Sequence, residues 1–302
     1  MLVVLLVLLL AWPVGLLIWA NGKIQHVDAG EASLDTPGTT YLLAGSDSRD
    51  EDEDRFQNDP TEGQRADTIM ILTVPRSGTS SLISLPRDTY VEIPDHGMNK
   101  LNAAFSFGGP ALLRQTVENL TGIGVDHYVE IGMGGVANVV DAVDGVELCL
   151  DYDVDDADSR LVWEAGCHVA DGDTALAFAR MRNADPLGDV GRTMRQQQVI
   201  QAVTSNVADP SVLINPAEQV RLADAGLGAL QVSEGSNIVD LGRMGLAFRN
   251  ATGDDGVRGA PPIADMNYRP GGVGSTVLLA DNADAFFAAV ADGSVTDADT
   301  ND

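Results

Sequence analysis

The chain reads Tyr41-Leu42-Leu43-Ala44 and then Gly45-Ser46-Asp47-Ser48-Arg49, a short apolar run followed at once by small and charged residues. An apolar run of this length that ends at a glycine is typical of a buried strand. In an α/β sheet the ligand crevice lies beyond the ends of such strands. The stretch therefore favours an α/β fold in which Asp47 holds a metal ion and Arg49 faces a phosphate. The alternative for such residues after a strand is a simple turn.

The rest of the chain alternates between strand-like and helix-like segments. Strands are expected over residues 68–74, 81–85, 90–93, 127–131, 146–150 and 277–280. Helices are expected over residues 110–121, 135–143, 190–207, 216–230, 238–249 and 282–290, while 172–178 is ambiguous. This alternation predicts an α-β-α sandwich, a central mixed sheet flanked by helices.

The first twenty residues predict a membrane segment. Leu and Val run unbroken from Leu2 to Leu10, and the sequence stays apolar to Ala20. About 20 apolar residues suffice to span a bilayer. A cleaved signal peptide is the alternative, but no basic residue precedes the run, so we expect an uncleaved transmembrane helix. Both interpretations place the bulk of the chain outside the cytoplasm, as a single-pass protein of the cell membrane with an extracytoplasmic domain.

The remaining boundaries follow from composition. We expect a transmembrane anchor, a polar stalk, a main domain, a C-terminal extension packed on that domain and a disordered acidic tail, over residues 1–20, 21–38, 39–210, 211–292 and 293–302. The formal net charge is -27, and no broad basic patch occurs, so nucleic acid is excluded as a partner.

Cations are scarce, and they are grouped. Seven arginines lie in five short segments, each of which, except Arg180-Met181-Arg182, holds or adjoins an Asp. The guanidinium group offers a rigid fork of donors that suits phosphate oxygens. Carboxylates hold the divalent ion that such substrates carry. The sequence therefore predicts a protein that handles a phosphorylated substrate, with a pyrophosphate as the favoured group.

Two further segments add acids and bases to this predicted site. In Arg65-Ala66-Asp67-Thr68, Asp67 would meet Asp47 if their strands are neighbours, and two carboxylates with phosphate oxygens make a plausible Mg²⁺ site. The alternative for Asp67 is local bonding to the backbone. In Pro86-Arg87-Asp88-Thr89, the proline presents Arg87 and Asp88 at a bend between two strands. A surface salt bridge between them is the alternative.

Three more pieces carry candidate substrate contacts. Lys100 and Asn102 form a polar pair two residues apart. Arg180 and Arg182 would point to one side if that piece is extended, and would diverge on a helix. The last piece, Arg192, Arg195 and Gln196, has the spacing i, i+3, i+4 of one helical face, for which a solvated surface is the equal alternative.

The two cysteines, Cys149 and Cys167, enclose a short loop. An oxidising compartment would let them pair, and two separate buried thiols are the alternative. The four histidines are scattered, and none accompanies a Ser or Cys in a nucleophilic arrangement.

Taken together, these segments resemble the LytR-CpsA-Psr family of cell-wall glycopolymer ligases. The resemblance runs from about residue 41 to residue 203 and rests on an ordered set of motifs. These are Gly-x-Asp-x-Arg, Arg-x-Asp-Thr, Pro-Arg-Asp-Thr, Lys-x-Asn-Ala with Gly108-Gly109, residues 140–146, Asp171-Gly172 with Ala175-Leu176, Arg-x-Arg, and Gly191-Arg192 ending in Arg195-Gln196. The chain departs from the pattern at Asp144, where a glycine is common, and in the acidic insertion 50–64.

The resemblance implies an enzyme that transfers a glycopolymer from a polyprenyl-pyrophosphate carrier to peptidoglycan or another wall acceptor. It implies that Mg²⁺ is held by Asp47 and Asp67. The catalytic residues would be Arg87, Asp88, Arg180, Arg182, Arg192 and Gln196, with Asp88 as a candidate base. Substrate contacts would come from Arg49, Arg65, Lys100, Asn102 and Arg195.

Two other functions remain open on the residues alone. A pyrophosphatase would hydrolyse the same lipid-linked bond, with water in place of the acceptor. A non-catalytic membrane protein that binds lipid phosphates for regulation would need the same arginines.

Overall fold

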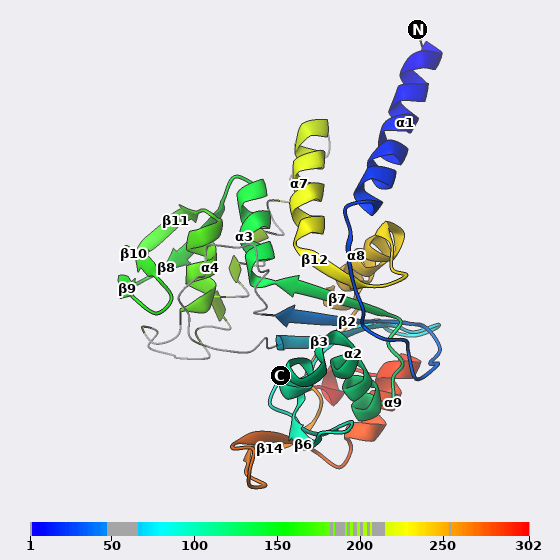
Figure 1. Cartoon of the computed structure of the whole chain (residues 1–302), viewed down its shortest axis with the longest axis vertical. Coiled ribbons are helices and arrows are strands. Elements are labelled where there is room, and N and C mark those ends of the chain that lie inside the picture. The colour runs from blue at the N-terminus through cyan, green and yellow to red at the C-terminus, as the bar shows by residue number, and fades with distance from the viewer. Residues whose placement is uncertain are drawn as a thin grey trace. The chain divides into compact units, whose positions relative to one another are not determined.

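The computed structural model describes residues 2–46, 66–181, 184, 191, 194–195, 198–199, 202–203, 206, 215–253 and 255–301. The chain forms two compact units, whose elements are labelled in Figure 1. One unit, here the sheet unit, comprises residues 24–131 and 231–302. The other, here the disulfide unit, comprises residues 1–23 and 132–230.

The sheet unit is built on one mixed seven-stranded sheet, of which β7, β2 and β3 lie side by side in Figure 1. Its order is β1 (Gln25–Val27), β12 (Leu230–Ser233), β7 (His127–Gly132), β2 (Thr39–Ser46), β3 (Ala66–Val74), β4 (Ser81–Ser84) and β13 (Val257–Gly259). The pairs β2–β3 and β3–β4 are antiparallel, whereas β1–β12 and β4–β13 are parallel. The predicted mixed sheet is confirmed.

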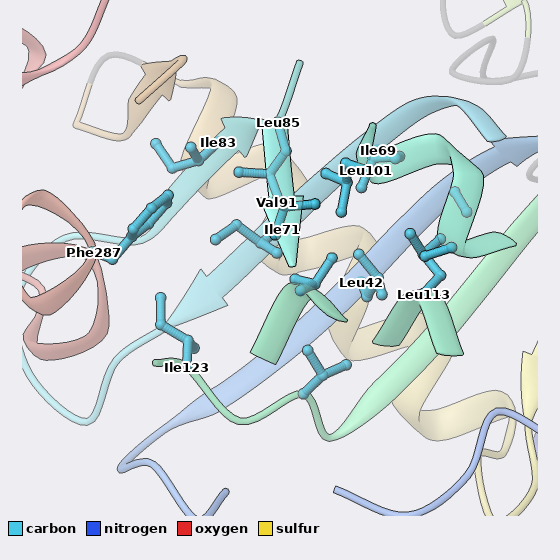
Figure 2. Close-up of a cluster of buried hydrophobic side chains, with 14 of the residues drawn as sticks. Leu42, Ile69, Ile71, Ile83, Leu85, Val91, Leu101, Leu113, Ile123 and Phe287 are labelled. Carbon is cyan, nitrogen blue, oxygen red and sulfur yellow. The ribbon is translucent and has the colours of Figure 1, made fainter. Parts of the chain in front are cut away.

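Alternation along the strands divides their side chains between two cores, because successive residues point to opposite faces. Leu42, Ile71 and Ile83 pack with α2 (Leu101–Thr121) and α9 (Ala283–Asp292), as Figure 2 shows for the side chains of Leu113 and Phe287. On the other face, Tyr41 and Leu72 pack with Ala247 and Ala251 of α8 (Ile238–Thr252). Helices on both faces make the predicted α-β-α sandwich.

Two hairpins extend the sheet unit. One is β5 (Tyr90–Ile93) with β6 (Gly97–Lys100), and the other is β14 (Ile263–Tyr268) with β15 (Thr276–Leu279). The strand β6 leads directly into α2, whose helical path is broken at Gly108 and Gly109 before Pro110. The helix predicted from residue 110 is therefore the second segment of α2. Its first segment was not predicted.

The disulfide unit has its own hydrophobic core, around Val140, Leu148, Trp163 and Phe178. Its helices are α1 (Leu2–Asn21), α3 (Met133–Ala142), α4 (Gly172–Arg180) and α7 (Pro216–Gly228). Its strands pair as β8 (Val146–Leu150) with β11 (Gly166–Ala170), and as β9 (Val154–Asp156) with β10 (Leu161–Trp163). The residues described between 191 and 206 are helical, in the range predicted for a helix.

The N-terminal helix α1 packs against α7. The indole Nε1 of Trp12 donates a hydrogen bond to the amide oxygen of Gln219 over 3.0 Å, and Lys23 pairs with Asp224 at 2.9 Å. Within the described part of the chain, no helix combines the length and the apolar character that crossing a membrane requires. The transmembrane anchor therefore stays a prediction.

Two segments are more ordered than their composition indicated. The predicted stalk contributes β1 to the sheet, and its Ser33 donates through both N–H and Oγ to the buried carboxylate of Glu118. The C-terminal segment predicted to be a disordered tail forms a 3₁₀ helix over Asp297–Asp299, and Asn301 bridges to Ala260. Long-range pairing with distant residues orders both segments, and composition does not reveal such pairing.

The departure from the family pattern at residue 144 has a backbone explanation. Asp144 adopts a φ of 59°, in the left-handed region that favours glycine. Asp is one of the few other residues that tolerate this conformation. Its carboxylate accepts two hydrogen bonds from Arg221, each 2.8 Å long, which lower the pKa of Asp144. The carboxylate thus joins α7 to the turn after α3.

Candidate functional site

A tight turn presents Arg87 and Asp88. The N–H of Thr89 donates to the carbonyl oxygen of Pro86 over 2.9 Å, and its hydroxyl donates to the same oxygen over 2.6 Å. Arg87 and Asp88 are therefore the two central residues of a β-turn between β4 and β5. The N–H of Val277 donates to the carbonyl of Asp88 and fixes the turn from outside. The predicted bend is confirmed.

A second predicted segment meets this turn. The Nζ of Lys100 lies 3.1 Å from the carboxylate of Asp88, and the N–H of Asn102 donates to the carbonyl of Arg87 over 2.9 Å. Four candidate residues from two segments are thus brought together. We call Arg87, Asp88, Lys100 and Asn102 the Pro86-turn cluster. Its ion pair is about one third exposed, so it contributes little stability and leaves both groups open to a ligand.

The strand that holds the candidate metal residue Asp67, β3, pairs with β2, the strand that ends one residue before Asp47. Gly45 pairs with Thr68 and Ser46 with Ala66, so the register shifts by one residue and Asp67 is the extra residue of β3. Bulges of this kind redirect side chains and are frequent beside active sites. The predicted meeting of Asp67 with Asp47 required neighbouring strands, and β2 and β3 are neighbours. Asp47 itself, with Arg49 and Arg65, lies outside the described residues, and no side-chain position is described for Asp67.

One buried acid near the end of β2, Glu130, was not predicted from the sequence. The carboxylate of Glu130, on β7, accepts hydrogen bonds from the hydroxyl of Ser46 and, over 2.8 Å, from that of Tyr128. Burial, with Glu130 close by, raises the pKa of Tyr128 and keeps its hydroxyl protonated as a donor. Glu130 therefore fixes Ser46, the residue that precedes Asp47. The sequence contained one signal for this role of Glu130, which is a carboxylate inside a predicted strand.

The disulfide unit carries the other candidate arginines. Arg180 stands in the last turn of α4, and Met181 leaves the helix, so Arg180 is helical rather than extended. Arg195 is buried, and its guanidinium donates to the backbone carbonyls of Phe178 and, at shorter range, Met181. Burial lowers its pKa.

These bonds cap the C-terminal end of α4, which favours a structural role for Arg195 over the predicted substrate contact. The i, i+3, i+4 spacing of Arg192, Arg195 and Gln196 predicted that they share one helical face, but it could not show what that face contacts. Arg182, Arg192 and Gln196 lie outside the described residues.

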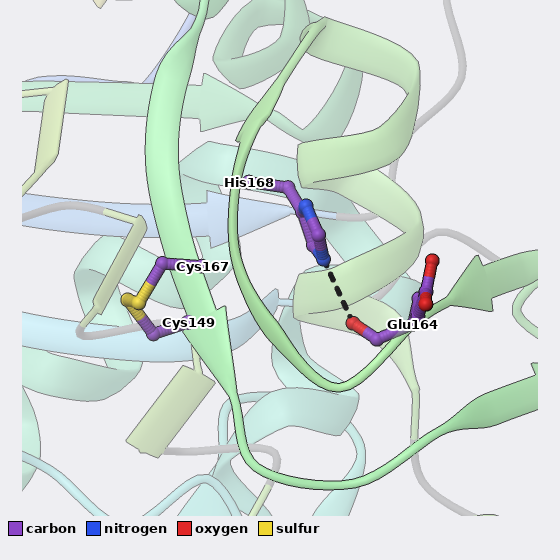
Figure 3. Close-up of a disulfide and its surroundings, with 4 residues drawn as sticks. All are labelled: Cys149, Glu164, Cys167 and His168. Atoms are coloured by element: carbon purple, nitrogen blue, oxygen red, sulfur yellow. Dashed lines mark hydrogen bonds between the residues drawn. A yellow bond between two sulfur atoms is a disulfide. The ribbon is translucent and has the colours of Figure 1, made fainter.

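The predicted disulfide is present. Cys149 on β8 stands directly opposite Cys167 on β11, and their Sγ atoms are bonded (Figure 3). Beside it, the Nε2 of His168 lies 2.9 Å from the carbonyl oxygen of Glu164. A disulfide across paired strands closes the loop that contains β9 and β10.

The Pro86-turn cluster combines two cationic residues with a carboxylate on backbone segments that hydrogen bonds fix, which suits a phosphate ligand. Among the side chains that the structure describes, no three His, Cys, Asp or Glu residues group as a metal site. The residues predicted to hold Mg²⁺ are Asp47 and Asp67, and neither side chain belongs to that described set.

Comparison with known proteins agrees with this architecture. The model of the LytR_cpsA_psr family matches residues 20–227. The chain is 46% identical over 239 residues to the probable cell wall biosynthesis protein LcpB of Corynebacterium glutamicum, covering 77% of this chain and 58% of LcpB. It is 38% identical over 191 residues to the polyisoprenyl-teichoic acid–peptidoglycan teichoic acid transferase TagU of Bacillus anthracis, covering 63% of this chain and 59% of TagU.

The fold also matches a solved structure, a LytR-Csp2A-Psr enzyme from Actinomyces oris. The TM-score is 0.64 at 22% identity, over 89% of this chain and 96% of that one. The chain spans about three fifths of the length of the two curated relatives. Because the family model covers more than half of the sequence, the chain belongs to the LytR_cpsA_psr family.

Proposed function

We propose that this chain is a phosphotransferase that moves a glycopolymer from a polyprenyl-pyrophosphate carrier to a hydroxyl of peptidoglycan or another cell-wall acceptor. The main support is the Pro86-turn cluster, in a chain of this family: Lys100 pairs with Asp88, and the backbone of Arg87 bonds to that of Asn102. The similarity to the Bacillus anthracis protein, a polyisoprenyl-teichoic acid–peptidoglycan teichoic acid transferase, supports the substrate class.

The chemistry required of the protein is mostly positioning and charge neutralisation. The acceptor hydroxyl attacks the phosphorus nearer the sugar, and a new oxygen–phosphorus bond forms. The bond to the departing polyprenyl phosphate breaks. In this scheme Arg87 binds the phosphate oxygens, and Asp88 accepts the hydroxyl proton while Lys100 limits its repulsion of the phosphates. For Arg180, Arg182, Arg192 and Gln196, contact with the phosphates stays a prediction.

Mg²⁺ is proposed as the cofactor, held by Asp47 and Asp67. Carboxylate oxygens are the donors that Mg²⁺ prefers, and the pairing of β2 with β3 supports the closeness of the two residues. When bound, the ion would neutralise charge on the pyrophosphate oxygens. The proposal predicts that turnover stops in chelator and returns when Mg²⁺ is added back. Undiminished turnover in chelator would contradict it.

We also propose that residues 1–20 anchor the chain in the cell membrane by a single pass, with the enzyme on the extracytoplasmic side. The unbroken Leu and Val of residues 2–10 and the disulfide both support this placement. Alkaline extraction of membranes tests the anchor. An integral protein stays with the lipid, and recovery in the soluble fraction would refute the anchor.

Incubating the full chain with a labelled lipid-linked glycan donor and wall fragments, and identifying the labelled products, distinguishes the candidate activities. A transferase yields label covalently joined to the wall polymer, together with free polyprenyl phosphate. A pyrophosphatase yields free phosphorylated glycan and no joined product. A regulatory binding protein retains the intact donor. Either of the last two results would replace the proposal.

A further inference from the structure

The sheet unit contains a cleft that the Pro86-turn cluster does not use. Its volume is about 670 Å³, and it lies between the β5–β6 hairpin and the second segment of α2. We call it the hairpin cleft. Its walls include Tyr90, Glu92 and Met98 from the hairpin, and Gln115, Asn119 and Leu120 from α2. This volume falls within the roughly 300–1,000 Å³ typical of small-molecule sites.

The lining is rich in hydrogen-bonding groups and poor in charge. Gln115 and Asn119 are exposed and one helical turn apart on α2, so both amides face the same way. Each amide offers two donors and an accepting oxygen, and Glu92 adds accepting oxygens. Glu92 is the one charged group among the described residues that line the cleft, and it disfavours a phosphate or any other anion.

Apolar surface completes the lining. The ring of Tyr90 lies edge-on to that of Tyr268, with 5.5 Å between the ring centres, which restrains its orientation. Met98 lies opposite Glu92 in the hairpin and is 45% exposed. A surface that joins aromatic and thioether groups to neutral amides suits a ligand with C–H faces and hydroxyl edges. A neutral sugar ring has this character.

The hairpin cleft adjoins the residues proposed to bind phosphate. Tyr90 pairs with Lys100 across the hairpin, and Lys100 holds Asp88 at 3.1 Å. A sugar next to a phosphate bound at the Pro86-turn cluster would thus lie near the Tyr90 end of the cleft. We propose that the hairpin cleft is a subsite for a neutral glycan segment. The role of this subsite in the reaction rests on the proposed function. The segment comes from the acceptor or from the donor polymer.

The test uses the full chain with both Gln115 and Asn119 replaced by Ala, and Asn250→Ala, another exposed helical amide, as the matched control. Alanine has the higher helix propensity, so the fold is expected to persist, as circular dichroism will check. Binding of a neutral β-1,4-linked N-acetylglucosamine tetramer is measured by titration calorimetry. Because the double variant loses two neutral hydrogen bonds, we expect it to bind the tetramer about tenfold more weakly than the wild type. We expect the control variant to bind with the affinity of the wild type.

Kinetics then identify the source of the sugar. A KM that rises about tenfold for wall fragments alone, at unchanged kcat, assigns the cleft to the acceptor, and a rise for the lipid-linked donor alone assigns it to the donor. Equal tetramer affinity in wild type and double variant, or no tetramer binding by the wild type, overturns the subsite. These binding results do not depend on Arg87, so failure of the subsite and failure of the proposed transferase are separate outcomes.

Discussion

Replacing Gly172 with alanine tests the packing that positions α4. Gly172 is the first residue of this helix, and its N–H donates to the carboxylate of Asp141 on α3 over 2.8 Å. A Cβ at this position would lie 2.3 Å from the carbonyl oxygen of Ala137 and 2.8 Å from a carboxylate oxygen of Asp141. The first atom is backbone, so α3 and α4 must separate to admit the methyl group.

The expected change in the free energy of unfolding is the sum of opposing contributions. Forcing an extra carbon into a packed contact costs about 1–3 kcal/mol, and weakening the bond to Asp141 costs about 1 kcal/mol more. The better helix propensity of alanine returns up to about 1 kcal/mol. We therefore expect Gly172→Ala to lower the free energy of unfolding by about 1–3 kcal/mol. We also expect lower transfer activity, because α4 carries Arg180 at its other end.

Gly226→Ala is the matched control. Gly226 lies in α7 of the same unit, and a Cβ there meets nothing within 4 Å. Without a clash, alanine should stabilise the protein by about 0.4–1 kcal/mol. In denaturant unfolding we therefore expect the two variants to change the free energy of unfolding in opposite directions. If Gly172→Ala matched or exceeded the stability of the wild type, the close approach of α3 and α4 would be wrong.

Three further variants test other contacts. Asp171 caps α4 by accepting from the N–H of Thr174, and Asp171→Ala should cost about 1 kcal/mol in urea unfolding. Hydrogen bonds from the side chain and from the N–H of Thr174 lower the pKa of Asp171, so its stabilisation is present above the unfolded pKa of about 3.9 and is lost as pH falls through the lower folded pKa. An identical wild-type–variant difference in the free energy of unfolding at pH 7 and pH 2 would contradict this. Cys149→Ser should cost about 3 kcal/mol, and finding free thiols at both cysteines of the wild type by mass spectrometry would contradict it. Glu130→Ala removes the carboxylate that accepts from the hydroxyls of Ser46 and Tyr128. We expect it to lower the free energy of unfolding by about 1–3 kcal/mol, measured by thermal unfolding, and to reduce turnover. Wild-type stability and wild-type turnover in this variant would exclude a positioning role for Glu130.

The layers of the fold were predictable because local patterns encode them. The runs that begin at Tyr41, Thr68 and Ser81 became the central strands β2, β3 and β4, since their alternating side chains fill the cores on both faces. Helix α8 begins at the predicted residue, Ile238, where Asn237 caps it. The short strands β1, β12 and β13 were missed. They are stabilised by pairing with distant strands rather than by their own sequence.

The candidate site was predictable only as residue types. Motif order identified Arg87, Asp88 and Lys100, and the structure joins them through one turn and one hairpin. Burial, by contrast, is a property of the folded chain. The sequence therefore could not show that Arg195 is used to cap α4, or that Glu130 lies beneath the end of β2.

In the proposed reaction, Arg87 binds the pyrophosphate while the donor glycan is transferred. The direct measurement is the rate at which labelled donor becomes joined to wall fragments by Arg87→Ala, with Arg76→Ala, an exposed arginine between β3 and β4, as control. We expect the transfer rate to fall at least about a hundredfold in Arg87→Ala, as for other groups that stabilise a transition-state charge, and to stay unchanged in Arg76→Ala. Full transfer by folded Arg87→Ala would contradict it.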